Sequence, residues 1–413
     1  MLFLFLSSKI NKEKRENPKG GKAMQKLSNG VSNYEDLIRE NRVYIDKTMY
    51  IEKMESLPNK ALMFLRPRKF GKTLFTSVLE NYYDKNKANE FDFLFKNTYI
   101  GKNPTQNKNS YCILRFNFSG IDTENVEATM KGFKDETIKS ANEFKEKYEV
   151  DFNINIESDA ESILNALIKA FYIQKSKEKI YVIIDGYDKF AREILELTEE
   201  NSEKMIYKSR KVRYWYEVLK EGTETVVDRI FITGEVPITL DGLTSGFNIG
   251  TDISLWNEFN DLLGFTEKEL KHILKKEEIG EEQQEKIISI MRENYGRYRF
   301  NFNAENQIYN PTIYLRFLYD YMKLKKIPDN LVSVNYYNQI NEFIGHCNDE
   351  KKIEILKKVD EENTILVDIV RKFNPEIKFD ERYIVSLLYY LGYLTISGEM
   401  LGMVKLTIPN KKI

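Results

Sequence analysis

The chain has 413 residues, of which 42% are hydrophobic and 31% charged, and its formal net charge is −1. This balance excludes a uniformly basic nucleic-acid coat and a membrane-surface protein, although it is compatible with a local basic face. The length exceeds one typical domain, and no apolar run is long enough to span a membrane. With two cysteines and two histidines, the sequence offers neither a disulfide framework nor a histidine-based metal or triad site. We expect a cytoplasmic multidomain protein.

The first 23 residues carry no periodic apolar face. Residues 1–6 are apolar but too short for a signal sequence, and a polar stretch follows them. Two glycines stand just before Met24, as they would if a purine-rich ribosome-binding site had been translated. We therefore expect Met24 to be the true start and residues 1–23 to form a disordered or peripheral leader.

A phosphate-binding loop is the most informative feature of the next segment. Short helices are predicted over 34–42 and 48–56, and an apolar strand over 61–65 leads into residues 66–73, RPRKFGKT, with a helical pattern over 73–83. In the order strand, Gly-Lys-Thr loop and helix, backbone N–H groups and the helix N-terminus form a positive site for phosphate. The alternative is an ordinary basic turn before a helix.

Individual roles follow from the Walker A pattern that this loop resembles. We expect Lys72 to reach the β- and γ-phosphates and the Thr73 hydroxyl to ligate Mg²⁺. Arg66 stands where the pattern has its first glycine, so the match depends on the Gly-Lys-Thr end and its context. The predicted nucleotide-binding residues are Arg68, Lys69, Phe70, Gly71, Lys72, Thr73 and Leu74.

Further along, strands and helices alternate. Strands are predicted over 111–118, 179–185, 229–233 and 250–254, and helices over 124–148, 157–174 and 206–220. Such alternation indicates an α/β fold with a parallel sheet and right-handed crossovers. Asp185 follows the apolar run 181–184 at the end of its strand, at the edge where such sheets bind ligands, so we expect it to hold Mg²⁺ opposite Thr73. The alternative is a simple strand end.

The C-terminal third is predicted to be mainly helical. Thr266 is a good helix cap, and helices over 282–295 and 312–323 would complete a lid. Arg297 and Arg299 lie between them, either in a solvated loop or within reach of nucleotide phosphates. A helix over 380–390 followed by a β-hairpin over 394–408 suggests a winged-helix-like module, which would bind DNA or a protein partner.

Five ordered motifs resemble those of the AAA-ATPase-like proteins of bacteria and archaea, P-loop ATPases that often carry a PD-(D/E)xK nuclease-like domain at the C-terminus. The matching segments are residues 44–48, 66–73, 185–189, 231–234 with 243–248, and 295–300 with 310–311. The resemblance covers roughly residues 26–410, and it makes Arg66 in place of glycine the habit of the family. It implies ATP and Mg²⁺ as ligands.

One departure from the family bears on catalysis. Relatives have a glutamate after the strand-end aspartate, where this chain has Gly186. Loss of a positioned general base typically costs about 10²–10⁴ in rate, so we expect a slow ATPase or an ATP-dependent switch. Asp188 is the alternative carboxylate, and a chance drift at Gly186 is another explanation. Thr233, at the tip of the fourth strand, is either a γ-phosphate sensor or a strand-terminating turn.

The predicted organisation is a P-loop AAA-ATPase-like domain at 24–265, a helical lid at 266–330 and a winged-helix-like module at 331–413. In relatives of this type, the fourth strand lies between the loop strand and the aspartate strand. Longer relatives continue past the position of Ile413 into the nuclease-like domain, so we expect no DNA cleavage by this chain. The alternative function is a non-catalytic protein- or DNA-interaction module with a structural nucleotide or none.

Overall fold

The computed structural model describes residues 30–122, 125–189, 202–238, 250–295, 297–324, 326, 364–373 and 380–409. Within these residues, five strands form a sheet of order β2-β3-β4-β1-β5, and every neighbouring pair is parallel. The strands are β1 (Ala61–Leu65), β2 (Tyr111–Asn117), β3 (Lys179–Asp185), β4 (Val227–Gly234) and β5 (Thr251–Asp252). The predicted α/β class and its parallel sheet are therefore confirmed. The predicted leader, residues 1–23, lies outside the described residues.

The order of the strands brings distant parts of the sequence together. β4 lies between β1 and β3, as the family resemblance implied, and Thr233 on β4 is in register with both Phe64 and Asp185. All three strands run in the same direction, so their carboxyl ends share one edge. The loop after β1 and the aspartate that ends β3 consequently lie on either side of the end of β4.

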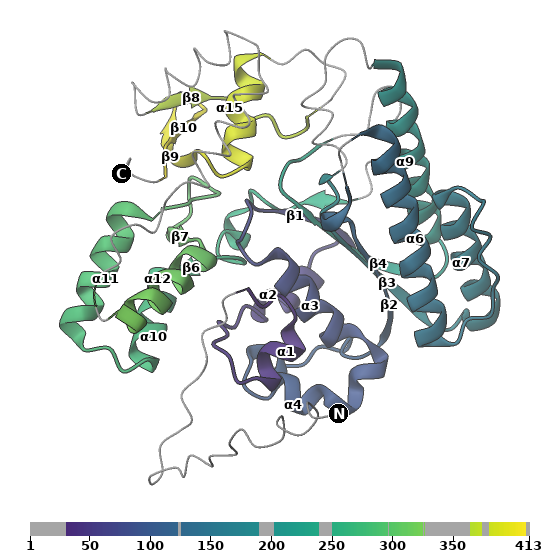
Figure 1. The fold of residues 1–413 in the computed structure, drawn as a ribbon, viewed down its shortest axis with the longest axis horizontal. Coiled ribbons are helices and arrows are strands. Elements are labelled where there is room, and N and C mark those ends of the chain that lie inside the picture. Colours follow the sequence, from purple (N-terminus) through teal and green to yellow (C-terminus); the bar gives the residue numbers. More distant parts are fainter. Residues whose placement is uncertain are drawn as a thin grey trace, which may run out of the picture.

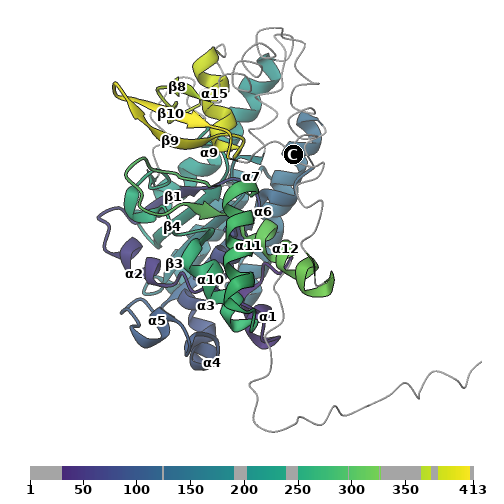
Figure 2. The ribbon, with the colours of Figure 1, turned by 90° about the vertical axis from the view of Figure 1, so that its left-hand side faces the viewer.

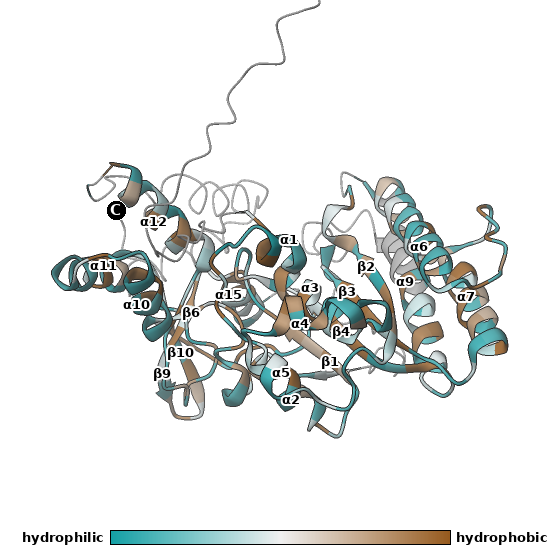
Figure 3. Ribbon diagram, turned by 90° about the horizontal axis from the view of Figure 1, so that it is seen from below, coloured by the Kyte–Doolittle hydropathy of each residue, from teal (hydrophilic) through white to brown (hydrophobic). Residues whose placement is uncertain are grey.

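Helices cover both faces of this sheet (Figure 1). On one face, α3 (Lys72–Tyr83) packs through Phe75 against Phe231, with ring centroids 5.8 Å apart. On the other face, Trp215 of α9 (Ser202–Gly222) packs against Phe116 of β2, with ring centroids 4.7 Å apart. α6 (Val126–Tyr148) and α7 (Ala160–Lys175) complete that layer. Because both faces are covered, the central residues of β1 and β3 are hydrophobic (Figure 3).

Shorter elements surround α3. α1 (Tyr34–Arg39) and α2 (Met49–Glu55) correspond to the two predicted N-terminal helices. The 3₁₀-helix η1 (Lys85–Glu90), α4 (Phe91–Phe95) and α5 (Tyr99–Lys102) were not predicted. They fold around aromatic contacts among Tyr82, Phe91 and Phe95, which bury the rings against α3.

The region predicted to form a lid is a mainly helical unit, and its apolar cluster also includes Val43 of the N-terminal segment. It comprises β6 (Phe265–Thr266), α10 (Glu267–Lys276), α11 (Glu281–Asn294), β7 (Ile308–Tyr309) and α12 (Pro311–Leu324). Thr266 and Glu269 form a complete capping box at the start of α10, which confirms the predicted cap. The buried residues of the cluster include Leu270, Ile273, Ile288, Met291, Tyr314 and Phe317.

The C-terminal residues form a helix and a small antiparallel sheet next to the lid (Figure 2). The order is β8-β10-β9, from β8 (Ile365–Val367), β9 (Thr395–Met400) and β10 (Met403–Thr407), with α15 (Glu381–Tyr390) beside it. The predicted helix and hairpin are present, whereas β8 was not predicted. Residues 327–363 and 374–379 lie outside the described residues. No helix in the described part of the chain is long and apolar enough to cross a membrane.

Candidate nucleotide-binding site

The loop between β1 and α3 leaves the start of α3 open. Lys69 and Gly71 both have positive φ angles, 67° and 99°, and Gly71 is the residue before the first helical turn. Such a backbone is accessible to glycine at little cost, which explains Gly71. Gly71, the N-cap of α3, makes no side-chain capping bond, and the first N–H groups of any helix lack intrahelical partners. A helix start of this kind is suited to bind an anion.

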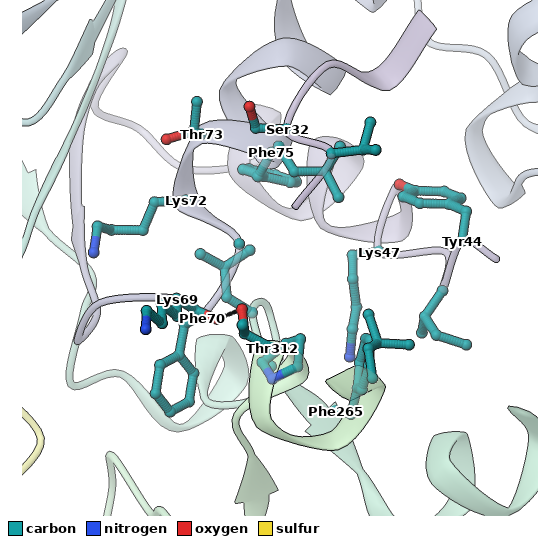
Figure 4. Close-up of a pocket in the computed structure, with 18 of the residues that line it drawn as sticks. Ser32, Tyr44, Lys47, Lys69, Phe70, Lys72, Thr73, Phe75, Phe265 and Thr312 are labelled. Carbon is teal, nitrogen blue, oxygen red and sulfur yellow. Dashed lines mark hydrogen bonds between the residues drawn. The ribbon is translucent and has the colours of Figure 1, made fainter. Parts of the chain in front are cut away.

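A cavity of about 290 Å³ adjoins this loop (Figure 4). Of the predicted nucleotide-binding residues, all but Arg68 line it. The remaining wall comes from the N-terminal segment, α3 and the lid, and it is mostly apolar. Its hydrophobic residues are Val31, Val43, Ile45, Phe75, Val78, Leu263, Phe265 and Leu315. The cavity thus has the β1–α3 loop as its floor and mostly apolar side chains as its walls. This combination is typical of small-molecule sites.

Lys72 is held by the loop that it belongs to. Its ammonium donates to the carbonyls of Arg66 at 2.7 Å and Pro67 at 3.0 Å, and it lies 3.9 Å from the Glu235 carboxylate. In Figure 4 the side chain points away from Tyr44. The charge therefore lies beside the start of the loop and the Glu235 carboxylate.

Asp185 lies close to Thr73 at the edge of the sheet. The Asp185 side chain is buried, and its Oδ2 atom has no hydrogen-bond partner among the described residues. Burial raises the pKa of this carboxyl above its usual range, while a hydrogen bond from Thr73 and the charges of Lys72 and Arg115 oppose that rise. A buried carboxylate oxygen without a partner is costly unless a ligand satisfies it.

The pair fits the predicted Mg²⁺ role, which stays a prediction. In the described part of the chain, no group of three or more His, Cys, Asp or Glu side chains gathers to hold a metal. Mg²⁺ commonly takes one or two protein ligands and completes its shell with water and phosphate oxygens. Thr73 and Asp185 would be such ligands for a nucleotide-bound ion.

Arg66 has a structural explanation. Only 1% of the residue is exposed, and its guanidinium donates to the carbonyls of Leu65, Ser254 and Phe259 at 2.8–2.9 Å. The same group lies over the rings of Phe64 and Phe300, 4.2 and 3.9 Å from their centroids. Arg66 therefore supports the loop from beneath, and it ties β1 to the segments after β5 and before the lid.

Gly186 is required by the backbone. Its φ angle is +73°, and an added Cβ would lie 2.9 Å from the backbone nitrogen of Ser119. The positive φ angle would strain any residue other than glycine. The close contact would in addition require the 118–120 turn to move. A glutamate grafted at this position would strain the site, so the missing carboxylate cannot be restored there simply.

The two predicted catalytic residues occupy structural positions. Asp188 is buried, and its Oδ2 accepts hydrogen bonds from the backbone N–H groups of Glu235 and Val236, both at 2.9 Å. The Thr233 hydroxyl donates to the Phe64 carbonyl at 2.8 Å, across the sheet. For Thr233 this geometry favours the strand-end alternative over a phosphate sensor. For Asp188 it favours an anchor of the turn after β4 over a general base.

Glu235 was missed by the sequence reasoning. It follows the Thr-Gly end of β4, and its carboxylate lies 3.2 Å from Arg68 Nε and 3.9 Å from Lys72 Nζ. An acidic residue just past a strand that borders a phosphate-binding loop was the available signal. Because β4 was predicted to lie beside β1, the residue just after β4 could have been expected near the loop that follows β1.

The lid contacts the loop, and the N-terminal segment contacts the lid and the residues just before it. Asn310 and Thr312 donate to the carbonyls of Arg68 and Lys69, each at 3.3 Å. The buried ammonium of Lys47 binds the Asp261 carbonyl at 2.9 Å and the Glu269 carboxylate at 2.7 Å. These contacts give the 44–48 and 310–311 motifs structural roles at the rim of the cavity.

The two lid arginines lie elsewhere. Neither Arg297 nor Arg299 lines the cavity. The Arg297 guanidinium donates to the Arg292 carbonyl at 2.6 Å, and the Arg299 N–H donates to Thr395 at 2.8 Å. This arrangement favours the alternative in which they do not reach the nucleotide.

A parallel sheet with β4 between β1 and β3, an open helix N-terminus after β1 and a carboxylate at the end of β3 are consistent with the P-loop class of α/β proteins. A family model described as a predicted AAA-ATPase matches residues 28–244, which is more than half of the chain. The chain therefore belongs to the AAA-ATPase-like family. No curated protein matches it.

Proposed function

We propose that this protein binds ATP with Mg²⁺ in the cavity beside the β1–α3 loop. The observation that carries the proposal is the cavity itself, about 290 Å³ in volume, whose floor is the loop and the open N-terminus of α3. Phosphate oxygens would accept from the loop N–H groups and from Lys72. The apolar walls from α3 and the lid suit a purine base and ribose.

Thr73 and Asp185 would hold the metal ion at the sheet edge. Bound there, Mg²⁺ supplies positive charge that offsets the negative charge of the phosphates. Asp185 would gain the partner that its Oδ2 atom lacks. In this proposal the nucleotide-binding domain spans 24–265 and the lid spans 266–330, and the lid contributes Thr312 and Leu315 to the cavity wall.

We propose a switch function with slow turnover. The slow turnover follows from the glycine at position 186, where relatives have a glutamate. The switch is supported by contacts between the loop and the C-terminal segment. Gly392, in the C-terminal segment, approaches Pro67 so closely that an added Cβ would lie 2.8 Å from the proline Cβ. The Tyr298 hydroxyl donates to the Gly392 carbonyl at 3.2 Å. A change of the loop on nucleotide binding would therefore reach the 331–413 module, which we propose to be winged-helix-like and to contact DNA or a protein partner.

The test is a calorimetric titration of the full chain with a non-hydrolysable ATP analogue, with and without Mg²⁺, alongside a turnover assay with ATP. We expect one site per chain, tighter binding with Mg²⁺ than without it, and slow release of phosphate. No binding of the analogue under either condition would reject the nucleotide-binding function and leave the interaction module without nucleotide.

A further inference from the structure

The turn after β4 places the carboxylate of Glu235 near two cations of the β1–α3 loop, Lys72 and Arg68. Asp185 and Thr233 are directly paired across β3 and β4, and Thr233 is also paired with Phe64 of β1. Glu235 stands two residues beyond Thr233, and Gly186 one residue beyond Asp185. Glu235 is therefore at the same sheet edge as the glycine, displaced by one strand toward the loop.

The side chain of Glu235 shares its surroundings with the lysine that would bind the phosphates. Its carboxylate is 3.9 Å from Lys72 Nζ and 3.2 Å from Arg68 Nε, and only 14% of the side chain is exposed. In the proposed complex, Lys72 bonds to the β- and γ-phosphates. A carboxylate in contact range of that ammonium would then lie close to the terminal phosphate, with two cations offsetting its charge.

The backbone that carries Glu235 is fixed. Asp188 accepts the N–H groups of both Glu235 and Val236, and the Arg66 N–H donates to the Gly234 carbonyl at 3.1 Å. Gly234 has no room for a side chain, because an added Cβ would lie 2.5 Å from Asp188 Oδ1. A group held by such a turn is preorganised, as a general base must be.

We infer that Glu235 is the general base for nucleotide hydrolysis, in place of a carboxylate at Gly186. The inference rests on the proposed function, since it needs ATP at the loop. The oxygen of a water molecule forms a bond to the γ-phosphorus, and the bond from that phosphorus to the bridging oxygen breaks, so that its electron pair leaves with ADP. The proton lost by the water passes to the Glu235 carboxylate and then to solvent, and the products are ADP and phosphate. Asp188 acts in this scheme as a positioning residue.

The experiment compares the full chain with Glu235→Gln, Glu235→Asp and a control, Glu221→Gln, an exposed glutamate at the end of α9. Binding of Mg–ATP is measured by calorimetry and hydrolysis by single-turnover assay. We expect Glu235→Gln to slow hydrolysis about 100-fold or more, in the range of a lost general base. Its affinity for Mg–ATP should stay equal or rise, because the substitution removes a negative charge that competes for Lys72. Glu235→Asp should give an intermediate rate, and the control should match the unchanged protein.

The outcomes separate the inference from the proposed function. If Glu235→Gln hydrolyses ATP as fast as the unsubstituted protein, the inference is overturned, while the proposed ATP binding stands. The same holds if the unsubstituted protein binds Mg–ATP but does not hydrolyse it. Loss of both binding and turnover in Glu235→Gln also overturns it, because Glu235 would then be part of the binding loop. Failure of the unchanged protein to bind Mg–ATP rejects the proposed function itself.

Discussion

Replacing Arg66 with glycine, which restores the common phosphate-loop pattern, is expected to destabilise this protein by roughly 3–5 kcal/mol rather than to improve it. The substitution leaves the carbonyls of Leu65, Ser254 and Phe259 without their buried donor. It also opens a void between the Phe64 and Phe300 rings, which the guanidinium now fills. Denaturant unfolding of both proteins measures the difference in the free energy of unfolding.

Arg66→Lys gives the matched comparison. Lysine keeps the positive charge but lacks the planar fork that reaches several carbonyls at once and stacks on aromatic rings. We expect Arg66→Lys to lower the free energy of unfolding, but by less than Arg66→Gly does. A glycine variant whose free energy of unfolding stays within about 1 kcal/mol of the unchanged protein would show that Arg66 does not support the loop.

Lys72→Ala should have the largest effect on ATP binding. Lys72 lines the cavity, and its charge acts on the Asp185 carboxyl. A hydrogen bond to a charged group is worth about 1.5–3 kcal/mol. We therefore expect the affinity for Mg–ATP to fall by roughly 10- to 100-fold or beyond detection. Calorimetric titration of the variant beside the unchanged protein measures this change.

Lys60→Ala is the control for Lys72→Ala. Lys60 comes directly before the first residue of β1, at the end of the strand away from the loop. It is exposed and forms an ion pair with Asp228. Its loss should leave the affinity unchanged. Equal affinities of the Lys72 variant and the unchanged protein would exclude Lys72 from phosphate binding.

The sheet and the loop could be predicted from the sequence because their signals are local. The strand that ends at Asp185 is buried on both faces after its exposed first residue, so residues 180–184 form an apolar run. Gly71 indicates a turn because glycine tolerates positive φ angles, and Thr266 indicates a helix start because its hydroxyl can accept a backbone N–H. The position of β4 between β1 and β3 came instead from the family resemblance, since alternation of strands and helices does not fix the order of strands.

Features that depend on contacts between distant residues were not predictable in this way. The Arg66 guanidinium sits between Phe64 and Phe300, which are more than 230 residues apart in the chain, and no local pattern shows that. The short helices η1, α4 and α5 form because aromatic rings pack against α3. Asp188 resembled a catalytic carboxylate in sequence, but its two backbone hydrogen bonds are tertiary contacts.

Hydrogen exchange of the full chain, with and without Mg–ATP, tests most directly whether the nucleotide lies on the β1–α3 loop. We predict slower exchange of the backbone amides of residues 69–74 in the presence of Mg–ATP, because these N–H groups would bond to phosphate oxygens. Exchange in α7, in the layer on the other face of the sheet, should not change. Binding of Mg–ATP without protection of residues 69–74 would contradict the site.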